Sequence, residues 1–208
     1  KRYEIPTGIN KKKAITLSEI GLIYDYPVTP GTTRAMARDY WLFQYFCNGM
    51  NTKDMCLLKY KNIHDNIILF ERAKTMRTKR TVEQIRVFVT DDVRRIIKEH
   101  GNKDRNANNY IFPVLRPGLT IEKQRQLIQQ TSHLVSDHMK EIAKELAINK
   151  KVNVAASRHS FATILQRSGV STSFISEALG HTSEKTTKNY LAGFEDNQKM
   201  EAAKALTA

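Results

Sequence analysis

The stretch "SRHSFATILQRSGVSTSFISEALGHTSEKTTKNYLAGF", residues 157–194, decides the fold of this chain. Its apolar residues recur at helical spacing, and glycine-containing turns interrupt them. Gly180 stands where a helix C-cap is expected, so that His181 leaves the helix oriented and partly exposed. The pattern predicts three consecutive helices, at 157–168, 171–179 and 184–191.

Three side chains of this stretch suit phosphoryl transfer without a metal, which needs a nucleophile and cations for the phosphate oxygens. Arg158 offers a planar fork at the start of its predicted helix, where the helix N-terminus would add positive charge. His181 can donate a hydrogen bond or assist a proton transfer. A tyrosine hydroxyl ordinarily stays protonated at neutral pH, so Tyr190 becomes a nucleophile only where cations stabilise its phenolate. Taken singly, Arg158 could equally cap a loop and Tyr190 could be an ordinary aromatic, so the three are judged together.

This combination resembles the tyrosine recombinase, or phage integrase, family. That family has an Arg-His-(Ser/Thr)-Phe-Ala-Thr helix, then Leu-Gly-His, then a tyrosine nine residues on, and the same order is found here. The sequence of this stretch is most similar to integrases of Bacteroidetes mobile elements. The resemblance covers about residues 14–195 and implies a site-specific DNA recombinase with the tyrosine recombinase catalytic-domain fold.

The resemblance also implies a role for each matching residue. Tyr190 would attack the scissile phosphate and form a 3′-phosphotyrosine, Arg158 would bind the non-bridging oxygens, and His181 would hydrogen-bond the phosphate. Lys74 would protonate the leaving 5′ oxygen, and Asp54 would support the site. From the residues alone, Lys74 could equally be a solvated lysine.

Two positions depart from the family pattern. Asn51, in "NGMN", stands where the family has the arginine that forms the second phosphate clamp, and Ala155 stands where it has His or Tyr. Loss of an arginine clamp should slow the reaction by roughly 10²-fold or more if no other cation replaces it. The sequence offers four replacement candidates: Arg34, Arg38, Arg72 and Arg77.

A β-hairpin with a cationic tip is predicted in the middle of the chain. "IILFE" (67–71) and "IRVFVT" (85–90) are rich in β-branched and aromatic residues, and the basic segment "AKTMRTKR" joins them. Basic side chains at such a tip can follow a DNA backbone, although plain solvation would explain them equally well. The predicted DNA-binding residues are Arg77, Lys79 and Arg80 on the hairpin and His159 beside Arg158.

Further helices complete an α+β fold that is mainly helical with a small antiparallel β-sheet. The first helix is expected in "TLSEIGLIYDY" (16–26), with Thr16 or Ser18 near its N-cap. A core helix with dense apolar positions should follow from Thr33 and end near Gly49. The remaining helices are expected at 52–60, 91–101 and 120–147.

The charge of the chain points to a polyanion. The sequence has 34 Lys and Arg against 21 Asp and Glu, a net charge of +13. A domain this basic usually binds nucleic acid, and a solvated basic surface is the alternative. No apolar run approaches the roughly 18 residues of a membrane helix, so a membrane partner is not expected.

Neither a metal nor another cofactor is expected. Cys47 and Cys56 are the only cysteines, and both lie among apolar residues, as reduced buried thiols of a cytosolic protein do. The sequence lacks the paired ligand spacing of a zinc site and the Walker loop of an ATPase. Two transesterifications through a phosphotyrosine conserve bond energy and need neither.

The resemblance implies a domain organisation and partners as well. Residues 1–13 would be a linker from an N-terminal core-DNA-binding domain, and 14–208 the catalytic domain, with a tail from about 192 that docks on a neighbouring protomer or packs in cis. The working unit would be a tetramer on double-stranded DNA in the bacterial cytoplasm, with accessory DNA-bending proteins as further candidate partners. Two rival functions stay open: a DNA-binding module that has lost catalysis, and a nicking-closing enzyme similar to type IB topoisomerases.

Overall fold

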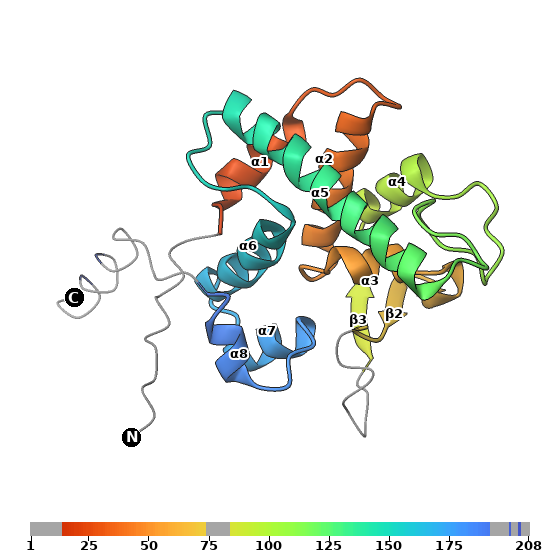
Figure 1. The fold of residues 1–208 in the computed structure, drawn as a ribbon. Helices are drawn as coiled ribbons and strands as arrows, with labels where there is room; N and C mark the ends of the chain where they lie inside the picture. The colour runs from red at the N-terminus through yellow and green to blue at the C-terminus, as the bar shows by residue number, and fades with distance from the viewer. Residues whose placement is uncertain (1–13, 74–83, 192–199, 201–203, 205–208) are drawn as a thin grey trace, which may run out of the picture.

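The computed structural model describes residues 14–73, 84–191, 200 and 204 (Figure 1). Within these residues, eight α-helices, one 3-10 helix and three short strands follow one another along the chain. The elements are α1 (Leu17–Asp25), α2 (Thr33–Phe46), α3 (Thr52–Leu57), η1 (Tyr60–Asn62), β1 (Ile63–His64), β2 (Ile67–Phe70), β3 (Ile85–Phe88), α4 (Asp91–His100), α5 (Ile121–Glu145), α6 (Val154–Arg167), α7 (Thr172–Ala178) and α8 (Glu184–Lys188).

The helix ends follow local chemistry that the sequence displays. Thr16 caps α1 through a capping box, in which its hydroxyl accepts from the Glu19 amide and the Glu19 carboxylate accepts from the Thr16 amide. Single hydroxyl caps begin four of the other helices. These caps are Thr32, Thr90, Thr120 and Ser171.

The central element is α2, which packs against α4, α5 and α6. It carries six consecutive buried residues, Asp39 to Gln44, so nearly its whole circumference lies in the core. The indole of Trp41 is fully buried, and its Nε1 donates to the carbonyl of Asn153 just before α6, at 2.8 Å. This bond ties α2 to the helix that carries the candidate site.

The predicted hairpin is confirmed, and it gains a strand. β2 pairs antiparallel with β3 in the register Ile68 to Val87 and Phe70 to Ile85, and these four side chains are buried. The two-residue strand β1 adds a third, outer strand that the sequence did not predict. The expected fold class, a mainly helical α+β domain with a small antiparallel sheet, is confirmed. The cationic tip itself, with Lys74, Arg77, Lys79 and Arg80, lies outside the described residues.

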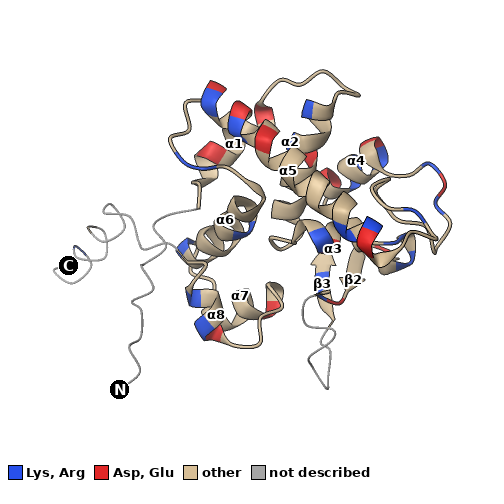
Figure 2. Ribbon diagram, viewed as in Figure 1, with Lys and Arg blue, Asp and Glu red and all other residues tan. Residues whose placement is uncertain are grey.

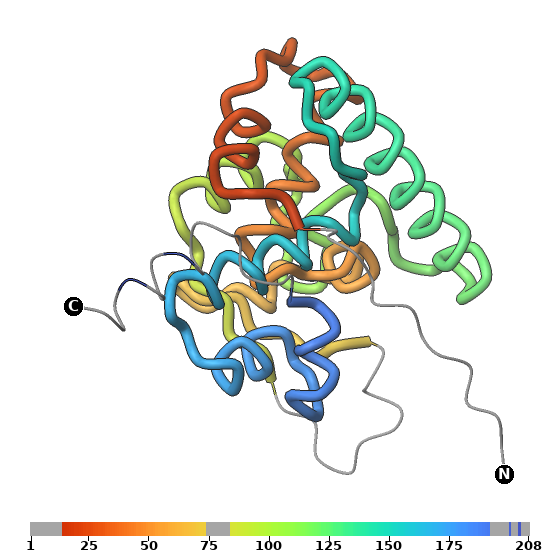
Figure 3. The backbone as a smooth tube through the Cα atoms, turned by 90° about the vertical axis from the view of Figure 1, so that its left-hand side faces the viewer, coloured from red at the N-terminus to blue at the C-terminus, as the bar shows by residue number. Residues whose placement is uncertain are grey.

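The short helices α7 and α8 lie below α2 and α5, and α6 connects them to the core. In Figure 1 and in the side view of Figure 3, α7 and α8 lie together at the lower end of the molecule, with α6 leading down to them. α7 contacts both α8 and β3, so this group meets the sheet. Residues from opposite halves of the sequence therefore come together along this contact.

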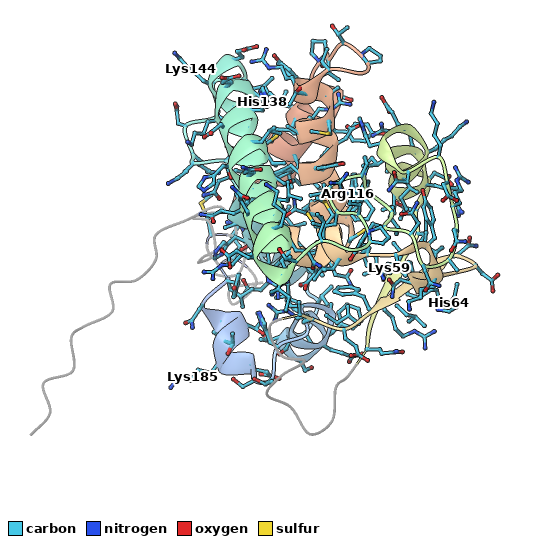
Figure 4. All side chains as sticks on the ribbon, turned by 45° about the vertical axis from the view of Figure 1, so that its right-hand side comes forward. Lys59, His64, Arg116, His138, Lys144 and Lys185 are labelled. Carbon is cyan, nitrogen blue, oxygen red and sulfur yellow. The ribbon has the colours of Figure 1, made fainter. Side chains whose placement is uncertain are left out.

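Ion pairs account for much of the charge at the other end of the molecule. Figure 2 shows acidic and basic residues side by side on α4 and α5. Arg34 of α2, for example, lies 2.6 Å from Glu145 and 3.4 Å from Glu141, both on α5. In Figure 4, His138 and Lys144 of α5 lie at the opposite end of the molecule from Lys185 of α8.

Candidate active site

Arg158 lies on the second turn of α6, not at the start of a helix as predicted. The helix begins three residues earlier than expected, and Asn153 caps it by accepting from the amides of Ala155 and Ala156. The prediction that a helix N-terminus adds positive charge beside Arg158 was therefore wrong. Arg158 is instead an interior residue, only 4% exposed, whose long side chain reaches out of the helix.

The guanidinium of Arg158 bridges two segments that are distant in sequence. Its Nη1 donates to the carbonyl of Gly49 at 2.8 Å, and its Nη2 donates to the carbonyl of Leu179 at 2.6 Å. The first carbonyl belongs to the turn after α2 and the second to the end of α7. Among the residues that the structure describes, its Nε is buried without a hydrogen-bond partner, which leaves a donor for an anion.

His181 is oriented by the turn that ends α7. The Gly180 amide donates to Glu177 and the His181 amide donates to Ser176, which is the Schellman pattern, and Gly180 has a φ of 62°. The imidazole Nε2 lies 3.1 Å from Nη2 of Arg158, and its Nδ1 lies 2.9 Å from the hydroxyl of Thr187. Because arginine only donates, Nε2 accepts here and Nδ1 carries the proton. The predicted helix end and exit of His181 are confirmed.

Tyr190 follows the short helix α8 and lies between two imidazoles. Its ring centroid is 4.7 Å from that of His159, nearly stacked, and 5.0 Å from that of His181. The carbonyl of Tyr190 accepts from Nδ1 of His159 at 3.2 Å and from the hydroxyl of Thr163 at 3.4 Å. The guanidinium carbon of Arg158 lies 5.4 Å from the ring centroid. The three residues that the sequence proposed together do come together.

A second arginine and a buried carboxylate lie at the same site. Arg72, two residues past β2, is 8% exposed and donates through Nη1 to the carbonyl of Gly180 at 3.1 Å. Asp54 of α3 is 6% exposed, and its Oδ1 accepts from the amide of Ala73 at 3.0 Å. The carboxylate thus holds the chain segment that carries Arg72. The sequence predicted Asp54 for the site and left Arg72 as one candidate among four.

These charges act on Arg158. Burial lowers the pKa of the guanidinium, and the positive charge of Arg72 lowers it further. The charge of Asp54 and a hydrogen bond with the side chain of Tyr190 raise it, and the net pKa is about 10. Arg158 is therefore cationic at neutral pH, yet it lies in a site with excess positive charge that an anion would relieve.

The two positions that depart from the family pattern do not supply a cation. Asn51 is the N-cap residue of α3, and its side chain makes no capping hydrogen bond. Ala155 is exposed in the first turn of α6. The sequence did not single out Thr163 or Thr187, whose hydroxyls hold Tyr190 and His181, because threonines are common at helix surfaces and no spacing marked these two.

A hollow of about 660 Å³ adjoins His181. Ser176 and Glu177 of α7 and Gln84 before β3 line it, together with the turn between α7 and α8. A similar hollow of about 680 Å³ lies between η1, β1 and α4, and none of its lining residues belongs to the site described above. His181 is the one residue of the site described above that lines this hollow, which gives a ligand access to its imidazole.

The best-placed group of metal-ligand types in the described chain lies elsewhere, at Asp39, Glu99 and His100. The fully buried carboxylate of Asp39 already binds Arg38 and Arg95 at 2.8 and 3.1 Å and His100 at 2.9 Å. A metal ion there would face two guanidinium groups, so the cluster fits a structural charge network better than a metal site.

The two cysteines are free and buried, as predicted. Burial raises the pKa of the Cys56 thiol to about 12 and that of Cys47 still further. Thiols held in this state are inert as nucleophiles.

Comparison with known proteins agrees with this geometry. Residues 13–196 match the Phage integrase family, and the chain belongs to that family. It is 33% identical over 114 residues to a tyrosine recombinase of Thermosipho africanus (strain TCF52B), a match that spans 51% of this chain and 40% of the relative. The chain therefore spans less than half the length of that relative.

Solved structures share the fold. The chain is similar to the XerA recombinase, with a TM-score of 0.62 over 99% of this chain and 69% of that one, and to the XerH site-specific recombinase in a post-cleavage complex with difH DNA, with a TM-score of 0.67 over 100% and 56%. The Tn1549 transposon integrase in complex with transposon right end DNA gives 0.57 over 99% and 69%. Sequence identities of 18%, 18% and 16% make these likenesses of fold. The tyrosine recombinase catalytic-domain fold is confirmed.

The described residues contain no helix that is long and apolar enough to span a membrane.

Proposed function

We propose that this chain is the catalytic domain of a site-specific DNA recombinase that cuts and rejoins strands through a covalent 3′-phosphotyrosine. The observation that carries the proposal is the meeting of Arg158, His181 and Tyr190: Nη2 of Arg158 lies 3.1 Å from Nε2 of His181, and the guanidinium carbon lies 5.4 Å from the centroid of the tyrosine ring. A cation in contact with a tyrosine hydroxyl stabilises the phenolate that attack on phosphorus requires. Family membership supports the same function.

The reaction is balanced by these groups. The Tyr190 hydroxyl releases its proton to solvent, its oxygen forms a bond to phosphorus as the bond to the 5′ oxygen breaks, and the 3′ phosphate stays on the protein. The 5′ oxygen takes a proton from Lys74, which lies outside the described residues. A 5′ hydroxyl from a second strand then returns a proton to Lys74 and attacks the phosphotyrosine. The diester is restored as the bond from phosphorus to the Tyr190 oxygen breaks, and the released phenolate takes up a proton from solvent. Bond energy is conserved throughout, so we propose that no cofactor takes part.

Arg158 and His181 would act on the non-bridging oxygens. The buried Nε of Arg158 and the one remaining hydrogen of its Nη1 can donate to phosphate oxygens, because both hydrogens of Nη2 already bind Leu179 and His181. Nε2 of His181 accepts from Arg158 in this structure, so it donates to a phosphate only when the imidazole is protonated or changes tautomer. His159, which the sequence assigned to DNA, is held against Tyr190 and would position the nucleophile.

We propose double-stranded DNA as the substrate and a DNA-bound tetramer of the same chain as the working unit. The proposal rests on the net charge of +13 and on the DNA complexes among structures of the same fold. The linker at 1–13, the hairpin contacts and the tail from about 192 belong to this proposal and lie outside the described residues, as does any contact with DNA-bending proteins. A bacterial cytoplasmic location and kinship with integrases of Bacteroidetes mobile elements also remain proposals.

A covalent-capture experiment tests the function. The chain is incubated with a library of random duplexes, each carrying one nick, so that cleavage near the nick releases a short strand and traps the adduct. We expect a band of protein linked to DNA that survives denaturation and is absent from Tyr190→Phe. Tyr24→Phe is the matched control, because Tyr24 is exposed and its hydroxyl binds Asp92 away from the site.

The outcomes separate the rival functions. DNA binding without any covalent adduct would support the alternative function, a DNA-binding module that has lost catalysis. An adduct that relaxes a supercoiled plasmid but never joins two different duplexes would favour a nicking-closing enzyme. Joining of two duplexes that depends on Tyr190 supports recombination.

A further inference from the structure

Arg72 and Arg158, from opposite halves of the sequence, both donate hydrogen bonds to the turn that ends α7. Arg158 donates to the carbonyl of Leu179, and Arg72 donates to the next carbonyl, that of Gly180. His181 is the following residue. Two guanidinium groups and the candidate imidazole therefore converge on three consecutive positions at the end of α7.

Glycine at position 180 makes this approach possible. A Cβ there would lie 2.7 Å from Cδ of Arg72 and 2.4 Å from Cδ1 of Ile85, both closer than a real Cβ tolerates. Asp54 fixes the other side of the segment by accepting from the amide of Ala73. The place of Arg72 is therefore set by close packing and by a buried carboxylate rather than by solvent.

A buried pair of like charges is unfavourable in the absence of a counter-ion. Arg72 and Arg158 are 8% and 4% exposed, and the positive charge of Arg72 lowers the pKa of Arg158. Two guanidinium groups on one turn are typical of anion sites, where the ligand supplies negative charge. A phosphodiester oxygen held beside Tyr190 is such a ligand.

The other replacement candidates are engaged elsewhere. Arg34 pairs with Glu141 and Glu145 on α5. Arg38 binds Asp39 and the carbonyl of Tyr26. Both lie on α2 among ion pairs that belong to the fold, and Arg77 lies outside the described residues. Of the candidates that the structure describes, Arg72 alone lies at the site.

We propose that Arg72 supplies the second guanidinium clamp on the scissile phosphate, in place of the arginine that the family has where Asn51 stands here. The proposal rests on the proposed phosphotyrosine chemistry. The clamp comes from the end of β2 instead of from the start of α3, and it binds a non-bridging oxygen together with Arg158. The short neutral side chain of Asn51 is then free of a catalytic role.

The test uses the nicked duplex best captured by the wild-type chain, with either an ordinary scissile phosphate or a methylphosphonate, in which a methyl group replaces one charged oxygen. Rates of adduct formation are measured for the wild type, Arg72→Ala, Arg72→Lys and Arg34→Ala. We expect Arg72→Ala to be slowed by roughly 10²-fold or more on the phosphate. On the neutral methylphosphonate the loss should shrink to less than about tenfold, because the oxygen charge that Arg72 neutralises is gone.

The comparison of substrates separates a phosphate contact from a structural role. Arg72→Lys, which keeps a charge and most of the stem, should be slowed less than Arg72→Ala and show the same recovery, so the test survives if the alanine variant does not fold. Arg34→Ala should match the wild type on both substrates. Equal losses on both substrates, or a wild-type rate for Arg72→Ala on the phosphate, would overturn the role of Arg72 and leave the proposed function intact. Absence of an adduct with the wild type would overturn the proposed function instead.

Discussion

Replacing Gly49 by alanine should damage the site more than the loss of a glycine alone explains. Gly49 has a φ of 60°, and its carbonyl accepts from Nη1 of Arg158. A Cβ at this position would lie 2.8 Å from Cα of Arg158 and 3.1 Å from its Cγ. The first contact is with helix backbone, which cannot swing away as the end of a side chain can.

The structure gives the magnitude. A left-handed conformation costs an alanine about 1–2 kcal/mol, and forcing a methyl group into a packed site costs about 1–3 kcal/mol more. Gly49→Ala should therefore lower the free energy of unfolding by about 2–5 kcal/mol. Gly31 is the matched control, with a φ of 78° and no atom within 4 Å of the position that a Cβ would take, so Gly31→Ala should lose about 1–2 kcal/mol.

Urea unfolding followed by the fluorescence of Trp41, the single buried tryptophan, measures both variants. The entropic gain from replacing a glycine in the unfolded chain is common to both variants and cancels in the comparison. We also expect adduct formation by Gly49→Ala to fall at least roughly tenfold under conditions where the protein is folded, because Arg158 must move. Equal destabilisation of the two variants would refute the close approach of Gly49 to Arg158.

Two further predictions concern His159 and Asp39. His159→Ala removes the stacking on Tyr190 and the hydrogen bond to its carbonyl, so adduct formation should slow about tenfold. The affinity for DNA, measured by fluorescence anisotropy, should stay unchanged. A lower affinity at an unchanged rate of adduct formation would instead support a direct contact between His159 and DNA. Burial alone would raise the pKa of Asp39, but hydrogen bonds from His100 and Arg95 and the charge of Arg38 outweigh it and lower the pKa from 3.8 to about 2. Because the folded-state pKa is the lower one, this stabilisation is present above pH 4 and is lost as the pH falls towards 2, by about 2 kcal/mol. Asp39→Asn should remove that part of the acid dependence of urea unfolding, and an unchanged slope between pH 4 and 2 would contradict the assignment.

The sequence predicted the parts of the fold that depend on local chemistry. Hydroxyl caps such as Thr16 mark helix starts, and Gly180 marks the end of α7, because their effects act within one turn of the chain. The start of α6 was predicted three residues late, since the cap is an asparagine, Asn153, in a run without strong periodicity. The strand β1 was missed because two residues carry no readable alternation.

In the candidate site as well, the sequence predicted only what residues close together along the chain determine. Arg158, His181 and Tyr190 lie within 33 residues, and the motifs around them, with their spacing, led to the family. Arg72 is separated from Arg158 in the sequence by β3, α4 and α5, so nothing in its neighbours along the chain distinguished it from Arg34 or Arg38. Only the packing of the β2 end against the turn after α7 made that distinction.

In the proposed mechanism, the turn after α7 allows an arginine at a different sequence position, Arg72 instead of residue 51, to bind the same phosphate. The carbonyls of Leu179 and Gly180 are fixed by the Schellman turn that also orients His181, so each guanidinium that donates to them is positioned relative to the imidazole. The position of an arginine guanidinium is thus set by the carbonyls to which its N–H groups donate. The helix or strand that carries the arginine needs only to lie within side-chain distance of those carbonyls. β2 ends close enough to α7 for the side chain of Arg72 to reach. In the proposed mechanism, Asn51 is therefore compatible with a complete set of phosphate ligands, because the requirement is for two guanidiniums around one oxygen, not for an arginine at one position of α3.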